Sequence, residues 1–136
     1  MACYRCERLY FESPLFKHIK MSFIISMEDS ARREAYMQEL RRVRPTAEVI
    51  VLHNMGYKRC SKENVSNSHQ DLWHANLEVF RRTAHLETPI LVLEDDVKFT
   101  DHIKQYAADI YFSSVTLPTL SSQNYIGPKR SKLQMW

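Results

Sequence analysis

The apolar residues of the chain gather in three short runs, at residues 22–27, 48–52 and 90–93, with longer polar stretches between them. Each run is too short for a typical helix, and its apolar residues are consecutive, so both of its faces avoid water. This pattern is typical of strands buried in a parallel sheet. We therefore predict three buried strands.

The polar stretch after the first run has the spacing of a helix. Residues 31–43 place Tyr36, Leu40 and Val43 at positions i, i+4 and i+7, with charged residues on the other face. Polar residues before this stretch offer an N-cap, and Pro45 follows it. We predict an amphipathic helix that ends before the proline.

A second, longer helix is predicted to begin near Ser68, with Asp71 as the acid of a capping box. One apolar stripe at i, i+4, i+7 and i+11 then indicates the face that we expect to pack on the core. Its members are Trp73, Leu77, Phe80 and Ala84.

Alternating strands and helices predict an α/β fold, a doubly wound and mainly parallel sheet with flanking helices and right-handed crossovers. Residues 101–108 allow a short helix, and residues 109–112 a further short strand. We expect residues 1–20 to be an N-terminal extension, residues 21–112 to form the domain, and residues 113–136 to be an irregular C-terminal segment.

Three carboxylates, Glu94, Asp95 and Asp96, directly follow the third predicted strand. Ligands of open α/β sheets bind at the carboxyl ends of the strands, and a divalent cation relieves the repulsion between crowded carboxylates. Alternate residues of an extended chain share a face, so Glu94 and Asp96 are the predicted metal ligands. Asp95 is then expected to face away from the metal. A purely structural role, such as capping the next helix, is the alternative interpretation.

Composition excludes several classes of protein. The chain has 136 residues, a net charge of +3 and two glycines, Gly56 and Gly127, so neither a phosphate-binding P-loop nor a dinucleotide fingerprint can be written. Cys3 and Cys6 have no second pair to complete a zinc site. We see no secretory signal and no run near the ~20 apolar residues of a membrane span, so the expected location is cytoplasmic.

Four motifs in the same order resemble glycosyltransferase family 25, which includes lipopolysaccharide sugar transferases and collagen galactosyltransferases. A strand leads into Ile25-Ser26-Met27-Glu28 with Arg32 close behind, and a Ser68-His69 pair begins a helix. The acidic segment then matches as Leu-Glu-Asp-Asp-Val. A strand at 109–112 completes the resemblance.

The resemblance implies a GT-A fold that binds a UDP-sugar through Mn²⁺ or Mg²⁺ and transfers a hexose to a glycan or glycoprotein acceptor. It implies donor contacts for Asp95, Ser26, Arg32 and His69. Arg32 is equally placed to pair with Glu28 one helical turn earlier, and His69 to serve as a structural hydrogen-bonding group.

The catalytic residue stays unknown at this level. No Asp or Glu follows Phe112, so Asp101 and Asp109 are the nearby carboxylates left to act as a base, and the later half of the family domain is not recognisable. Whether the chain is an active enzyme is therefore open, and the alternative is a catalytically incomplete nucleotide-binding or partner-interaction module. Nucleic acid is not expected as a partner, because carboxylates at the sheet edge would repel phosphate unless a cation intervened, and no RNP-like aromatic pattern accompanies the basic residues.

Overall fold

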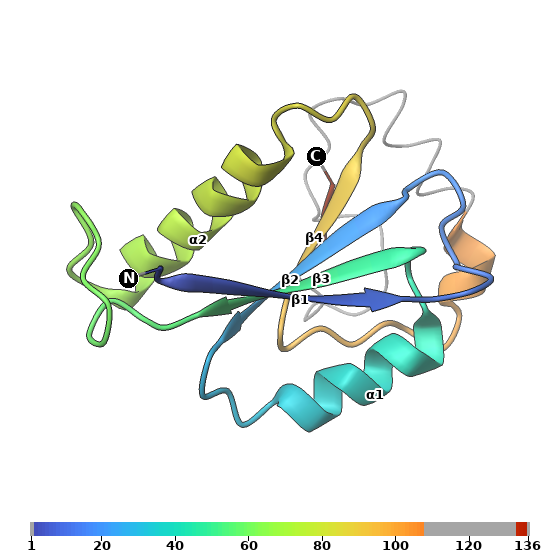
Figure 1. The fold of residues 1–136 in the computed structure, drawn as a ribbon. Coiled ribbons are helices and arrows are strands. Elements are labelled where there is room, and N and C mark those ends of the chain that lie inside the picture. Colours follow the sequence, from blue (N-terminus) through green and yellow to red (C-terminus); the bar gives the residue numbers. More distant parts are fainter. Residues whose placement is uncertain (1, 108–132, 136) are drawn as a thin grey trace.

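The structure is a computed structural model that describes residues 2–107 and 133–135. Its elements form one five-stranded sheet with the strand order β1-β3-β2-β4-β5 and two long helices (Figure 1). The elements in chain order are β1 (Tyr4–Tyr10), β2 (Met21–Met27), α1 (Arg33–Val43), β3 (Glu48–Asn54), α2 (Ser68–Thr83), β4 (Ile90–Glu94) and β5 (Leu133–Met135).

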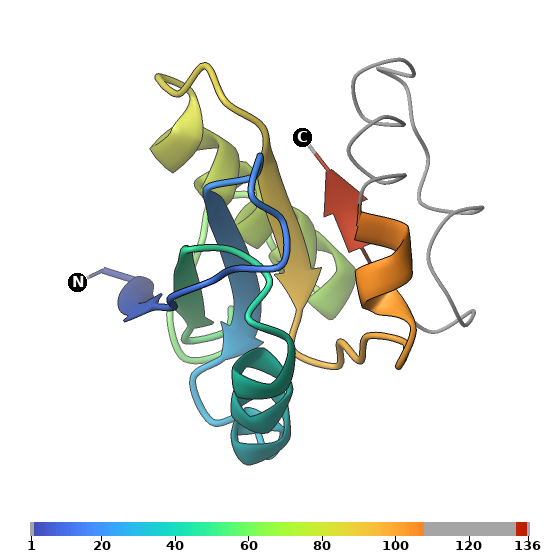
Figure 2. The ribbon, with the colours of Figure 1, turned by 90° about the vertical axis from the view of Figure 1, so that its right-hand side faces the viewer.

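The α/β prediction is confirmed, and the three predicted strands are the centre of the sheet. β2 is parallel to both β3 and β4, as the strand and helix alternation requires. The prediction of a mainly parallel sheet is wrong, because both outer pairs are antiparallel: β1 with β3, and β4 with β5. The sheet is therefore mixed, and Figure 2 shows β5 beyond β4 at its edge.

Each face of the sheet carries one long helix (Figure 1). Alternate residues of the central strands join two separate apolar clusters, because successive side chains of a strand point to opposite faces. Ile24 and Val51 pack with Tyr36 and Leu40 of α1. On the other face, residues such as Ile25 pack with the side chains of α2. The predicted core face of α1 is confirmed, since Tyr36, Leu40 and Val43 are all buried.

The expectation for residues 1–20 needs correction, because residues 4–10 are an edge strand of the same sheet. β1 pairs with β3 along its whole length. Its alternation of charged and apolar residues suits a half-exposed strand, and its charges are paired within the fold. Glu7 accepts hydrogen bonds from Arg33 at 2.8 and 3.0 Å and lies 3.0 Å from Nε2 of His53. The segment between β1 and β2 also contributes Phe16 and Ile19 to the core.

The predicted core face of α2 is wrong. Trp73, Leu77 and Phe80 are 66%, 49% and 38% exposed, and the buried side chains lie on another face, at Asp71, Ala75, Val79 and Thr83. Ala75 and Val79 on that face join the core cluster of the sheet, whereas the large residues on which the prediction was based lie outward. The capping prediction also fails, because Asn67 is the N-cap and accepts from the backbone N–H of Gln70.

Residues 103–107 are helical, in agreement with the predicted short helix at 101–108. The strand predicted at 109–112 lies outside the described residues, as does most of the segment 113–136, apart from β5. No helix in the described part of the chain is long and apolar enough to cross a membrane.

Candidate functional site

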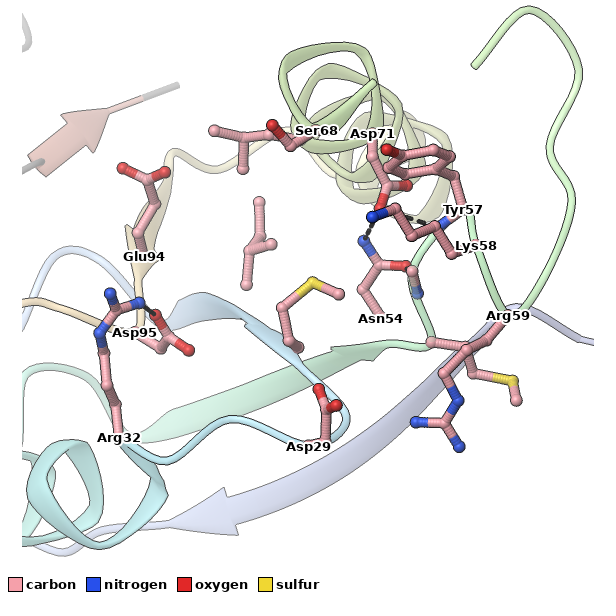
Figure 3. A pocket seen from close by; sticks show the side chains of 15 residues that line it. Asp29, Arg32, Asn54, Tyr57, Lys58, Arg59, Ser68, Asp71, Glu94 and Asp95 are labelled. Atoms are coloured by element: carbon pink, nitrogen blue, oxygen red, sulfur yellow. Dashed lines mark hydrogen bonds and ion pairs between the residues drawn. The ribbon is translucent and has the colours of Figure 1, made fainter. Parts of the chain in front are cut away.

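A pocket of about 520 Å³ lies at the carboxyl ends of β2, β3 and β4. The strand ends supply its floor and sides, the first turn of α2 supplies one flank, and the backbone after β3 supplies a wall. Figure 3 shows Arg32, Glu94 and Asp95 on one side, and Asn54, Tyr57, Lys58 and Asp71 on the other. The pocket therefore occupies the sheet edge where the sequence predicts a ligand.

Asp95 is buried and bonded to the loop between β2 and α1. Its Oδ2 accepts hydrogen bonds from the hydroxyls of Ser26 at 2.9 Å and Ser30 at 2.7 Å, and its Oδ1 accepts from Arg32 at 3.0 Å. These three donors come from residues more than sixty positions earlier in the chain. Asp95 thus fixes the loop that borders the pocket, with its carboxylate oxygens already engaged by protein donors.

Glu94 and Asp96 do not lie on one extended strand, as their prediction as paired metal ligands assumed. β4 ends at Glu94, and a turn follows in which the backbone N–H of Val97 donates to the carbonyl of Glu94 at 3.1 Å. Glu94 lines the main pocket, whereas Asp96 lines a second pocket of about 500 Å³ between α1 and residues 95–98. The prediction that Glu94 and Asp96 bind one metal assumed an extended chain, and the structure has a turn at this point.

Of the other residues predicted to contact the nucleotide sugar, some line the pocket and some lie outside it. Arg32 lines the pocket and pairs with Asp95, so the alternative pairing with Glu28 is not the one formed. Ser26 is buried behind Asp95. His69 is exposed and outside the pocket lining, while its neighbour Ser68 lies within it. The first turn of α2 thus faces the pocket through a different residue of the Ser-His pair.

A buried polar network that the sequence analysis missed supports the opposite flank. Nζ of Lys62 donates to Asp71 at 2.5 Å and to Oδ1 of Asn54 at 2.7 Å. Asp71 also accepts from the amide of Asn54 at 3.3 Å and from the backbone N–H of Tyr57 at 3.1 Å. A sequence signal existed, because Asn54 ends a buried strand at the same edge as Glu94. The network joins β3, the following loop and α2.

The wall after β3 is cationic and aromatic. Gly56, Tyr57, Lys58 and Arg59 line the pocket in succession, and Nζ of Lys58 lies 6.0 Å from the ring centre of Tyr57. Gly56 has φ of +86°, and a Cβ there would come within 2.8 Å of Cε of Met27. The positive φ therefore favours glycine at this position, whereas the flexible end of Met27 can move away from a Cβ.

Two groups outside the pocket lining have shifted pKa values. A hydrogen bond from Arg5 lowers the pKa of Glu28, so this carboxylate stays ionised. Burial, reinforced by the charges of Asp71 and Glu78, raises the pKa of Tyr4, whose hydroxyl lies 2.6 Å from Nδ1 of His74. Tyr4 therefore keeps its proton under ordinary conditions.

The arrangement suits a ligand with anionic and apolar parts. Lys58 and Arg59 offer positive charge, Glu94 and Asp29 offer carboxylate oxygens, and apolar side chains such as Leu72 cover the remaining surface. No group of three or more His, Cys, Asp or Glu side chains in the described residues is arranged to hold a metal ion. A cation here would need oxygen atoms from its ligand as well as from the protein.

Comparisons of the chain with protein-family models, curated proteins and solved structures give no significant match. The function is therefore inferred from the pocket, its side chains and the motif resemblance.

Proposed function

We propose that this chain is a glycosyltransferase-like domain of GT-A type that binds a nucleotide sugar in the pocket at the carboxyl ends of β2, β3 and β4. The observation that carries the proposal is the position of Glu94, the first acid of the Leu-Glu-Asp-Asp-Val segment, in the lining of this pocket. Nucleotides bind open α/β sheets at this edge. The volume of about 520 Å³ suits a ligand of that size.

The charges of the pocket support a diphosphate group in the ligand. Lys58 and Arg59 lie on the wall, and the side chain of Arg32 is 62% exposed although it also bonds to Asp95. Ser68 and its neighbours bring the amino end of α2 to the pocket, where the helix dipole favours an anion. These features attract phosphate from two sides of the pocket.

A divalent cation, Mn²⁺ or Mg²⁺, is part of the proposal. Glu94 would hold such a cation together with water and oxygens of the ligand, the usual manner of Mg²⁺ in nucleotide sites. Asp29 is a second pocket carboxylate, whereas Asp96 lines the neighbouring pocket. When bound, such a cation stabilises the negative charge that develops on the departing diphosphate.

Transfer of the hexose to a glycan or glycoprotein acceptor requires a base near the acceptor hydroxyl. Asp101 does not line the pocket; it lies 3.6 Å from Arg42 of α1. Asp71 and Asp95 are both held by protein donors. These observations favour, as the second candidate, a nucleotide-binding module without transfer activity. Turnover of UDP-galactose or UDP-glucose with Mn²⁺ distinguishes the two candidates.

Calorimetric titration with UDP, in the presence and absence of Mn²⁺, tests the proposed site. We expect Mn²⁺ to strengthen UDP binding. Glu94→Gln should weaken the UDP affinity measured with Mn²⁺ by at least about tenfold. Glu87→Gln is the matched control, because Glu87 is exposed and precedes β4 at the opposite edge of the sheet. A UDP affinity that changes neither with Mn²⁺ nor with Glu94→Gln would refute the site.

A further inference from the structure

The cationic wall of the pocket ends at a disulfide. Cys60 follows Arg59 directly and is bonded to Cys3, which immediately precedes β1, with a Cα–Cα distance of 5.6 Å. The wall, residues 55–60, is thus tied to the outer strand of the sheet by a bond that spans 57 positions of sequence. Neither the resemblance nor the acidic motif assigns a role to this bond.

Other contacts hold the first half of the wall more firmly than the second. The backbone N–H of Met55 donates to the carbonyl of Cys3 at 3.0 Å, and that of Tyr57 donates to Asp71 at 3.1 Å. At the far end, the N–H groups of Arg59 and Cys60 donate to Gly56 at 3.1 and 2.8 Å, which are bonds within the wall itself. The disulfide therefore anchors the turn that carries Lys58 and Arg59.

We propose that the Cys3–Cys60 disulfide is a redox switch for the pocket: the oxidised chain holds the wall in its binding position, and reduction releases the wall and weakens ligand binding. The ligand part of this inference rests on the proposed function. The mechanical part, that the bond restrains residues 58–60, does not depend on it.

The reductant is a dithiol, either a protein dithiol or dithiothreitol. One of its thiolates attacks Sγ of Cys3, which is only partly buried, and Cys60 leaves as a thiolate that takes up a proton. The second thiol of the reductant then displaces Cys3 from the mixed disulfide. Two electrons pass to the protein, its S–S bond becomes two thiols, and the reductant becomes a disulfide.

Loss of the anchor lowers affinity because the wall must then be ordered when the ligand binds. Ligand binding must then also order the backbone of the turn that carries Lys58 and Arg59, which the disulfide otherwise orders beforehand. The ion pair of Lys62 and Asp71 does not depend on the disulfide, so it continues to hold the rest of this flank after reduction. We expect a fall in nucleotide affinity of roughly threefold to tenfold.

Limited trypsin digestion, followed by mass spectrometry, measures the wall directly, since it cleaves after Lys58 and Arg59. The samples are the oxidised chain, the chain reduced with dithiothreitol, and Cys3→Ser/Cys60→Ser. Cys6→Ser is the matched control, because it removes the free thiol and keeps the disulfide. Cleavage after Arg81 and Arg82, both exposed on α2, is the internal reference for general unfolding. UDP affinity with Mn²⁺ is measured on the same samples.

We expect reduction and the double substitution to raise cleavage after Lys58 and Arg59 severalfold relative to cleavage in α2, and to weaken UDP binding. An unchanged cleavage ratio, or a raised ratio with unchanged UDP affinity, would overturn the switch. A raised ratio in a chain that binds no nucleotide in either state would support the mechanical tie and refute the proposed function instead. If the double variant does not fold, the chemically reduced chain supplies the same comparison.

Discussion

Two buried carboxylates shape the pocket while being held by the protein itself. Asp95 receives three hydrogen bonds from the β2 to α1 segment, and Asp71 receives bonds from Lys62, Asn54 and Tyr57. Charged groups that are withdrawn from water need such partners. Their role is to position the segments that border the pocket, whereas Glu94 is the carboxylate that the proposal assigns to the ligand.

The ion pair of Lys62 and Asp71 is predicted to be sensitive to removal of one partner. Their side chains are only 2% and 6% exposed, so Lys62→Met leaves a buried carboxylate without its cation. We expect the free energy of unfolding to fall by about 3 to 5 kcal/mol, measured by urea denaturation.

Two further variants test whether that loss comes from the buried charge. Lys58→Met changes an exposed lysine of the same wall and should cost less than about 0.5 kcal/mol. Lys62→Met/Asp71→Leu removes both charges and should recover part of the stability. A cost for Lys62→Met as small as that for Lys58→Met would show that the pair is not desolvated.

At the scale of elements, α2 turns an unexpected face to the sheet. Its large apolar residues lie outward, and its buried face is built from small or polar side chains such as Ala75 and Thr83. Two leucines therefore differ sharply in burial although both occupy predicted core positions: Leu40 of α1 is 0% exposed, and Leu77 of α2 is 49% exposed.

This difference predicts unequal effects of the same substitution. Leu40→Ala should lower the free energy of unfolding by about 2 to 5 kcal/mol, because it creates a cavity in the core. Leu77→Ala should cost less than about 1 kcal/mol, because half of its side chain already meets solvent. Chemical denaturation of both variants checks the orientation of α2. Equal decreases in the free energy of unfolding would indicate that Leu77 lies in the core, as the sequence pattern predicts.

The attachment of β1 predicts a dependence of stability on pH. Hydrogen bonds from Arg33 and His53 lower the pKa of Glu7 from its ordinary value of 4.5. Because the folded-state pKa is the lower one, this stabilisation is complete above about pH 4.5 and is lost as the pH falls through the folded-state value. Between roughly pH 6 and roughly pH 3, the Glu7→Gln variant should lose less stability than the unsubstituted chain.

Glu12→Gln is the matched control for this titration, because Glu12 is exposed and lies two positions after the last residue of β1. Urea midpoints at several pH values give the comparison. If Glu7→Gln and Glu12→Gln show the same pH profile as the unsubstituted chain, Glu7 does not hold β1 in place through its charge.

The central elements could be predicted from the sequence because their signals are local. Consecutive apolar residues mark β2, β3 and β4, and the spacing of Tyr36, Leu40 and Val43 marks the buried face of α1. β1 escaped prediction because its charges are satisfied by partners far away in the chain, such as Arg33 for Glu7. Those ion pairs form only after folding, so no local sequence pattern predicts them.

For the molecule as a whole, the edge that carries the pocket was predictable, but the partners of its residues were not. Strand order places Glu94 beside Ile25 of β2, with β3 on the other side of β2. The turn after β4 separates Glu94 from Asp96, and the network of Asn54, Lys62 and Asp71 joins three elements. Such contacts depend on loop geometry, which the spacing of residues does not specify.

The central claim is that a metal-bound nucleotide occupies the pocket beside Glu94, and paramagnetic broadening of amide NMR signals by Mn²⁺ tests it most directly. With UDP present, substoichiometric Mn²⁺ should broaden the signals around Glu94 and Asp29, and Mg²⁺ with UDP should shift signals of residues 54–59 without broadening them. Glu94→Gln should remove the broadening, and Glu87→Gln should retain it. Broadening that is absent, or that centres on carboxylates away from the pocket, would contradict the account.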